Sequence, residues 1–117
     1  MVGGQENQDS LANRSCSACQ GGVEPLQAEA INEFAEQLSD GWQVVEQHHL
    51  EKQFKFKNFA EALAFVNKVG QIAEQQSHHP DIHLSWGKVE LTVFTHKISG
   101  LHENDFIFAA KVDQLTT

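Results

Sequence analysis

The feature that most constrains this chain is Pro80, because it separates a long stretch of helical periodicity from a stretch of strand-like alternation. The residue before a proline is sterically disfavoured from helical geometry, so a helix that begins near Phe59 should stop close to His79. Apolar residues recur every three or four positions before this point and every second position after it. The sequence therefore predicts a helix-to-strand junction here, with His78 and His79 at the end of the helix.

Helical and strand patterns alternate along the rest of the folded part. Pro25 suits the first turn of one helix, Asn58 can cap a second, and Asp105 would place negative charge in the first turn of a third. Two runs before the second helix and two after Pro80 alternate apolar with polar residues, as half-buried strands do. We expect helices over 26–39, 59–77 and 103–112, and strands over 42–46, 50–57, 82–86 and 89–93.

This order predicts an α+β fold in which three helices lie on one face of a four-stranded antiparallel sheet, in the order α-β-β-α-β-β-α. A length of 117 residues suits one domain. Residues 1–23 are rich in Gly, Gln, Asn and Ser and lack apolar periodicity, so we expect a flexible tail there and a folded domain over 24–117. Open sheet edges favour self-association, and we expect a homo-oligomer.

The charge of the chain narrows the classes of partner. There are 16 acidic and 8 basic residues, which give a formal net charge of −8. Because binding to a nucleic-acid backbone requires a basic face, we expect no nucleic-acid partner. No apolar run approaches the roughly 20 residues of a membrane helix, and no secretory signal opens the chain. We therefore expect a cytoplasmic protein with no membrane partner.

The two cysteines, Cys16 and Cys19, have the spacing of half a zinc site or of a redox pair. The sequence holds no second pair to complete a four-cysteine site, and a polar segment rather than a strand precedes the motif. We expect neither bound metal nor redox catalysis. The alternative is a metal or redox function shared between molecules.

Histidines gather around the junction at Pro80. Glu74 lies four residues before His78, one helical turn back, and a carboxylate there can orient an imidazole and favour its protonated form. His96 closes the strand pattern that follows. Because histidine ordinarily titrates near neutral pH, this group suits acid–base catalysis.

Two other interpretations use the same residues. His78 and His79 can be a surface pair that binds the last carbonyl groups of the helix. A metal site could also use imidazole and carboxylate ligands, although neighbouring residues of an extended chain point to opposite faces and rarely bind one ion. The candidate metal ligands are Glu74, His78, His79, His83 and His96.

The spacing of these residues resembles the signature of the pterin-4a-carbinolamine dehydratases. The segments 52–59 and 95–101 also resemble the strand-to-helix junction of that family and the stretch before its last helix. The resemblance extends over about residues 24–113. In order, the matching residues are Glu74, then three positions later the run His78-His79-Pro80, then Trp86, His96 and Asp105.

The resemblance implies an activity that needs no metal or organic cofactor. The family removes water from 4a-hydroxytetrahydropterin, which aromatic amino-acid hydroxylases release, and gives a quinonoid dihydropterin that is recycled to the tetrahydrobiopterin cofactor. The 4a-hydroxyl group leaves more easily when it is protonated, and the nitrogen beside that carbon must lose a proton. Histidines can serve both ends of such a reaction.

The resemblance also implies roles for single residues. His78 and His96 would exchange protons with the two faces of the pterin, and His79 would mainly hold the substrate. Glu74 would orient His78, and Asp105 would have a supporting role at the start of the last helix. All three histidines are matched to the active-site histidines of the family.

Aromatic residues and partners complete these expectations. Trp42 and Trp86 are expected at the substrate pocket, and the family suggests a homodimer or a homotetramer. His102 stands where the family usually has Ser or Thr, so the last helix would lose a cap worth about 0.5–2 kcal/mol if nothing replaces it. The alternative function is a non-catalytic protein-binding, assembly or transcriptional-coactivator module on the same fold, which the retained histidines disfavour.

Overall fold

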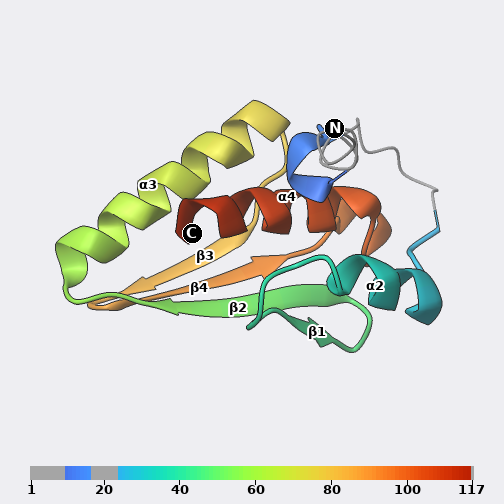
Figure 1. The fold of residues 1–117 in the computed structure, drawn as a ribbon, viewed down its shortest axis with the longest axis horizontal. Helices are drawn as coiled ribbons and strands as arrows, with labels where there is room; N and C mark the ends of the chain where they lie inside the picture. Colours follow the sequence, from blue (N-terminus) through green and yellow to red (C-terminus); the bar gives the residue numbers. More distant parts are fainter. Residues whose placement is uncertain (1–9, 17–23, 117) are drawn as a thin grey trace, which may run out of the picture.

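The computed structural model describes residues 10–16 and 24–116, and it confirms the predicted α+β fold. Three helices and four strands follow one another in the expected order, with the helices on one side of the sheet (Figure 1). The helices are α2 (Ala28–Ala35), α3 (Phe59–Gln76) and α4 (Glu103–Asp113). The strands are β1 (Gln43–Val45), β2 (His49–Lys55), β3 (Asp81–Ser85) and β4 (Lys88–Val93). Three short 3-10 helices are η1 (Leu11–Asn13), η2 (His96–Ile98) and η3 (Gln114–Thr116).

The sheet is antiparallel throughout and has the strand order β1-β2-β4-β3. The strands β2 and β4 therefore form its centre, and their register pairs Leu50 with Val93 and Phe54 with Val89. These four side chains are buried, while the alternate positions Glu51 and Gln53 are exposed. The two-residue period of strand side chains thus gives one apolar face for the helices and one polar face.

Helix α4 is the central element of the core. Nine of its eleven residues are buried, because α2, α3 and η1 contact it and its apolar side chains share one core cluster with those of the sheet. Figure 1 shows α4 lying over the sheet, between α3 and α2. A helix that is covered on all sides is apolar on all sides, and its few buried polar residues need specific partners. Two of them, Asp105 and Asp113, belong to the networks described below.

Helix α3 ends where the sequence predicts. At its start, the Asn58 side chain accepts a hydrogen bond from the backbone of Glu61 at 2.9 Å. At its end, Ser77 adopts a left-handed conformation with φ of 53°, and the backbone N–H of His78 donates to the carbonyl group of Ala73 at 3.1 Å. The chain then turns into β3. Because Ser77 is left-handed, His78 and His79 do not continue the path of the helix.

The start of α4 is capped without a hydroxyl group. His102 Nδ1 accepts from the backbone of Asn104 at 3.0 Å, and Asp105 Oδ2 accepts from the backbone of His102 at 2.9 Å. This reciprocal arrangement is a capping box in which an imidazole replaces the usual Ser or Thr. The cap that the sequence predicted to be lost is therefore supplied by His102 itself.

Two expectations about burial and order need correction. The first part of the predicted tail, residues 10–16, packs on α4 and buries Leu11 to 2% exposure; residues 1–9 and 17–23 and Cys19 lie outside the described residues. Trp86, expected at the substrate pocket, is 68% exposed at the turn between β3 and β4. Ile82 on the edge strand β3 is also exposed.

Among the described helices, none combines the length and apolar character that crossing a membrane would require.

Candidate active site

The three matched histidines line one pocket of about 620 Å³. His78 and His79 come from the segment after α3, and His96 comes from the first residue of η2, after β4. Two chain segments that are 17 residues apart in the sequence thus bring their imidazoles to one opening, because β3 and β4 form a hairpin that returns the chain. Other residues that line this pocket include Cys16, Gln76, Phe94, Thr95 and Lys97.

His78 is held by a buried carboxylate. Its Nε2 atom lies 2.6 Å from Oδ1 of Asp105, whose side chain has no exposed surface. The other oxygen of Asp105 accepts from Thr95 Oγ1 at 2.8 Å and from the backbone of His102 at 2.9 Å. A carboxylate accepts but does not donate, so Nε2 of His78 must carry the proton of this bond. The arrangement fixes the ring and leaves its Nδ1 atom for chemistry.

His79 has the partner that the sequence assigned to His78. Glu74 Oε2 lies 2.6 Å from Nε2 of His79, and the expected Glu74–His78 pair is not formed. The prediction assumed that the helix reaches His78, but α3 ends at Gln76. The left-handed turn directs His78 inward and His79 outward. With 60% and 80% of the two side chains exposed, the Glu74–His79 pair is surrounded by solvent.

His96 lies in a series of ring contacts at the exposed end of the pocket. Its ring centroid is 4.1 Å from that of Phe94, which in turn lies 4.7 Å from the ring of His48. His48 and His49 are half-buried, and their Nδ1 atoms lie 3.1 Å apart. Aromatic stacking therefore limits the orientations that the otherwise exposed His96 can adopt.

The two tryptophans lie outside this pocket. The indole of Trp42 donates to Asp113 at the end of α4 at 2.8 Å, and the ammonium group of Lys52 lies 5.6 Å from its ring. Trp86 lies at the far end of β3 from His79. Within one chain, the prediction that Trp42 and Trp86 contact the substrate is therefore not supported.

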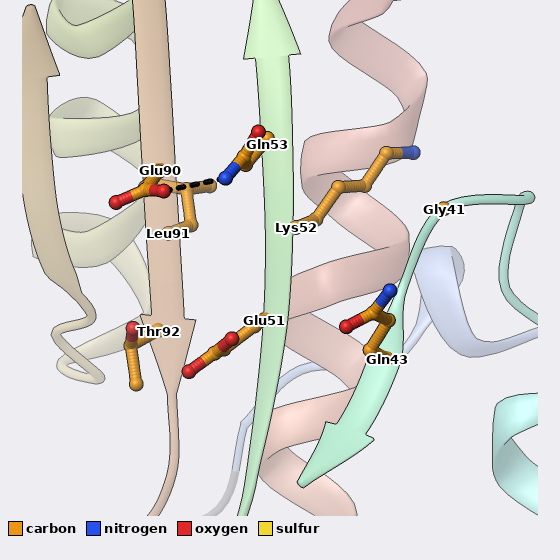
Figure 2. Close-up of a pocket in the computed structure, with 8 residues that line it drawn as sticks. All are labelled: Gly41, Gln43, Glu51, Lys52, Gln53, Glu90, Leu91 and Thr92. Carbon is orange, nitrogen blue, oxygen red and sulfur yellow. Dashed lines mark hydrogen bonds between the residues drawn. The ribbon is translucent and has the colours of Figure 1, made fainter.

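A second hollow, of about 500 Å³, lies on the polar face of the sheet across β1, β2 and β4 (Figure 2). Its lining includes Glu51, Glu90 and Gln53, and the amide of Gln53 donates to Glu90 at 2.6 Å. Lys52 also borders it, but the ammonium group of Lys52 bonds Ser39 and Asp113 instead. This hollow contains no histidine and is separate from the candidate active site.

The candidate metal site is not assembled in the described part of the chain. Across residues 10–16 and 24–116, no three His, Cys, Asp or Glu side chains converge as a metal ion would require. Glu74 and His79 pair with each other, His78 pairs with Asp105, and His83 is exposed on β3. Within the described part of one chain, the five candidate ligands Glu74, His78, His79, His83 and His96 are therefore not brought together.

Four residues of the site were not identified from the sequence. Thr95 supports Asp105, Phe94 stacks on His96, and Gln76 and Cys16 line the pocket and bond each other. Burial raises the pKa of the Cys16 thiol to about 11, although the nearby charge of Lys111 opposes this effect. Proximity to the histidine run was the available signal for Gln76 and Thr95. Cys16 carries no such signal, because it lies 60 residues from Gln76.

Comparison with known proteins places the chain in a family. Residues 24–115 match the family described as pterin 4 alpha carbinolamine dehydratase. A Rubrobacter xylanophilus protein assigned by name to these dehydratases is 59% identical over 105 residues, which cover 90% of this chain and 97% of that protein. An Alkaliphilus metalliredigens protein assigned in the same way is 54% identical over 106 residues, which cover 91% of this chain and 96% of that protein.

Solved structures agree with this assignment. A crystal structure from Brucella melitensis, described as a transcriptional coactivator/pterin dehydratase, superposes with a TM-score of 0.75 at 32% identity and covers 80% of this chain and all of that one. A pterin dehydratase-like protein described as a RuBisCO assembly factor has a TM-score of 0.56 at 27% identity, over 64% of this chain and 88% of that one. The resemblance seen in the histidine signature is confirmed, and the chain belongs to the pterin 4 alpha carbinolamine dehydratase family.

Proposed function

We propose that this protein dehydrates 4a-hydroxytetrahydropterin to quinonoid dihydropterin and water, and so serves the recycling of a pterin cofactor after aromatic amino-acid hydroxylation. The observation that carries the proposal is the single pocket lined by His78, His79 and His96, with His78 oriented by a buried carboxylate. Family membership supports the substrate class. The chemistry requires one proton to be added at the leaving hydroxyl group and one to be removed from the adjacent nitrogen.

The geometry suggests how the two protons are handled. His78 donates through Nε2 to Asp105, so its Nδ1 atom is the one that can exchange a proton with the substrate. His96, stacked on Phe94 at the open end of the pocket, is the second proton-transfer group. One imidazole protonates the 4a-hydroxyl as the carbon–oxygen bond breaks, and the other accepts the proton from the nitrogen. Water leaves, and no net proton is consumed.

His79 has a binding rather than a proton-transfer role in this proposal. Its ring is exposed at the rim and pairs with Glu74, which is itself exposed. A polar edge of the pterin can hydrogen-bond to this rim while the reacting carbon lies nearer His78. Loss of His79 should therefore raise KM more than it lowers kcat.

The test follows the ultraviolet absorbance of freshly generated 4a-hydroxytetrahydropterin, with the spontaneous decay as the reference rate. Wild type should accelerate the decay, and the double variant His78→Ala/His96→Ala should lose about 10²- to 10⁴-fold of that rate. His83→Ala is the matched control, because His83 is exposed on β3 outside the pocket, and it should retain wild-type activity. A double variant with full activity would refute the site assignment, and a folded wild type without activity would refute the dehydratase function.

A second candidate function is protein binding through an exposed apolar surface. The same surface is the candidate contact for self-association of the protein. Phe59 and Leu63 on α3 and Ile82 and Trp86 on and after β3 are exposed apolar residues, and α3 packs against β3. β3 is also an open edge of the sheet. We propose that this surface forms the contact between copies in a homodimer or homotetramer. If wild type lacks dehydratase activity, the same surface becomes the candidate site for a different protein partner.

A further inference from the structure

The segment 10–16 lies outside the residues that match the family, 24–115, yet it is firmly attached beside the pocket. Leu11 is buried in the core against α4. The ammonium group of Lys111 donates to the carbonyl group of Ala12 at 2.9 Å, and Arg14 pairs with Glu103. One apolar and two polar contacts thus hold the segment along α4, and they determine where its last residue lies.

That last residue, Cys16, contacts both the end of α3, which His78 follows, and the start of α4, which carries Asp105. Its backbone N–H donates to Oε1 of Gln76 at 2.8 Å, and Gln76 is the final residue of α3, two positions before His78. Its thiol donates to the carbonyl group of Asn104 at 3.6 Å, next to Asp105. Cys16 therefore connects the end of α3 to the start of α4, across which His78 and Asp105 meet.

Cys16 also forms part of the pocket lining together with the three histidines. Because burial raises the pKa of its thiol to about 11, the side chain is neutral at pH 7. A neutral thiol is a small, polarizable and weakly polar group rather than a nucleophile. It offers the pterin ring system a surface for close contact and brings no charge beside the histidines.

We propose that Cys16 is a wall of the substrate site against which the pterin ring packs, and that its bond to Gln76 makes Gln76 a positioning residue for His78. This inference rests on the dehydratase function proposed above. It extends the site beyond residues 24–115, which match the family model, to a segment that the sequence alone assigned to a tail. It also gives the N-terminal segment a role in substrate binding in addition to its packing on α4.

Two variants separate the parts of the proposal. Cys16→Leu projects a larger side chain into the pocket and should raise KM about tenfold with kcat within about twofold. Gln76→Leu removes the acceptor at similar size and should lower kcat about fivefold to tenfold and alter the pH profile of kcat, which a loss of stability alone would leave in place. Gln71→Leu, an exposed glutamine on the same helix, is the matched control and should behave as wild type. Near-ultraviolet circular dichroism verifies that each variant is folded.

A labelling experiment tests the contact between the pterin ring and Cys16 without measuring enzymatic activity. In a Cys19→Ser background, iodoacetamide modifies Cys16 at pH 9, and millimolar biopterin should slow this reaction at least fivefold if the ring packs on the thiol. An active wild type whose KM is unchanged by Cys16→Leu and whose labelling is not slowed would overturn the inference and leave the dehydratase function intact. An inactive, folded wild type refutes the proposed function. In that case the labelling experiment still tests whether a pterin packs against Cys16. Protection by biopterin supports this contact, and no protection refutes it.

Discussion

The imidazole of His78 and the carboxylate of Asp105 form a short, buried pair, with 2.6 Å between Nε2 and Oδ1 and no exposed surface on Asp105. The two residues are 27 positions apart, and the pair connects the end of α3 to the first turn of α4. Asp105 also accepts from the buried hydroxyl group of Thr95 and from the backbone N–H of His102 at the start of α4. Without Asp105 these donors would lose this acceptor. The carboxylate therefore serves stability and ring orientation at once.

Replacement of Asp105 by Ala should be among the most damaging single changes in this protein. It leaves His78, Thr95 and the backbone of His102 without their common acceptor, so we expect the free energy of unfolding to fall by about 2–4 kcal/mol. Urea denaturation monitored by circular dichroism measures this loss. The conservative variant Asp105→Asn should fold better and still lose activity, because its amide can present N–H rather than oxygen to the ring. Wild-type stability in Asp105→Ala would contradict the network.

Removal of the exposed Glu74–His79 pair should have little effect on stability. Glu74 and His79 are mostly exposed, and exposed ion pairs contribute about 0–1 kcal/mol. We expect Glu74→Gln to change the free energy of unfolding by less than about 0.5 kcal/mol and to lower activity mainly through KM. The same urea and absorbance assays provide both quantities. A loss as large as that of Asp105→Ala would mean that the exposure of this pair in solution differs from the structure.

The Cys16 thiol should titrate far above an ordinary cysteine. Its folded-state pKa is raised by burial to about 11 from a reference of 9.0, so alkylation in a Cys19→Ser background should keep accelerating with pH up to about pH 11. The raised pKa also has a defined sign for stability. Below pH 9 the thiol is protonated in both the folded and the unfolded state, so it adds no pH dependence to the free energy of unfolding. Between pH 9 and 11 only the unfolded state loses the proton, so the free energy of unfolding falls as pH rises.

The same pH window gives a matched comparison for this thiol. Cys16→Ala lacks the titrating group, so its stability should decline less between pH 9 and 11 than that of the Cys16 parent. Urea denaturation at pH 8 and pH 10.5 measures the difference between the two proteins. Parallel declines would show that the thiol is not buried as described.

A second buried ion pair should respond asymmetrically to mutation. Lys52 Nζ lies 3.4 Å from Asp113 Oδ1, and Asp113 also accepts from the indole of Trp42 and from the backbone of Ser39 at 2.8 and 2.9 Å. Asp113→Ala leaves three donors without this acceptor, one of them the buried ammonium group of Lys52, and we expect it to cost about 3 kcal/mol. Lys52→Met leaves Asp113 two of its donors and should cost about 1 kcal/mol. Urea denaturation ranks the two variants, and the opposite order would contradict the pairing.

If the exposed apolar surface on α3 and β3 joins two copies of the chain, a charge introduced there should weaken their association. Leu63→Glu introduces a carboxylate there and should shift the mass measured by light scattering after gel filtration towards that of a single chain of 13.1 kDa. Ala64→Glu adds the same charge at the neighbouring exposed position, off this face, and is the control. An unchanged mass in Leu63→Glu would place the interface elsewhere.

The sequence predicted the elements well because their signals are local. The end of α3 near Pro80, the cap at Asn58 and the alternation in β4 each depend on residues within a few positions of one another. The partner of Glu74 was missed for the same reason. A helical spacing rule holds only while the helix lasts, and one left-handed residue, Ser77, redirects the two histidines that follow it.

Contacts between distant segments could not be derived in this way. Nothing near Trp42 indicates that its indole binds Asp113, 71 residues later, and this bond directs the ring away from the pocket. In the same way, a single leucine in a polar segment gives no periodic signal, although Leu11 is almost completely buried. The family signature supplied the histidines and Asp105, whereas the contacts of Thr95 with Asp105 and of Phe94 with His96 became visible only in the structure.

The dual use of Asp105 has a consequence for the dynamics of the protein. The same carboxylate group closes the capping box of α4 and holds the ring of His78, so fraying of the first turn of α4 releases the imidazole. Helix ends open more often than helix centres, and such local opening is measurable by amide hydrogen exchange. The exchange protection of the first-turn amides of α4 should therefore report the fraction of molecules that hold an oriented His78, and conditions that fray this turn should reduce activity before the domain unfolds.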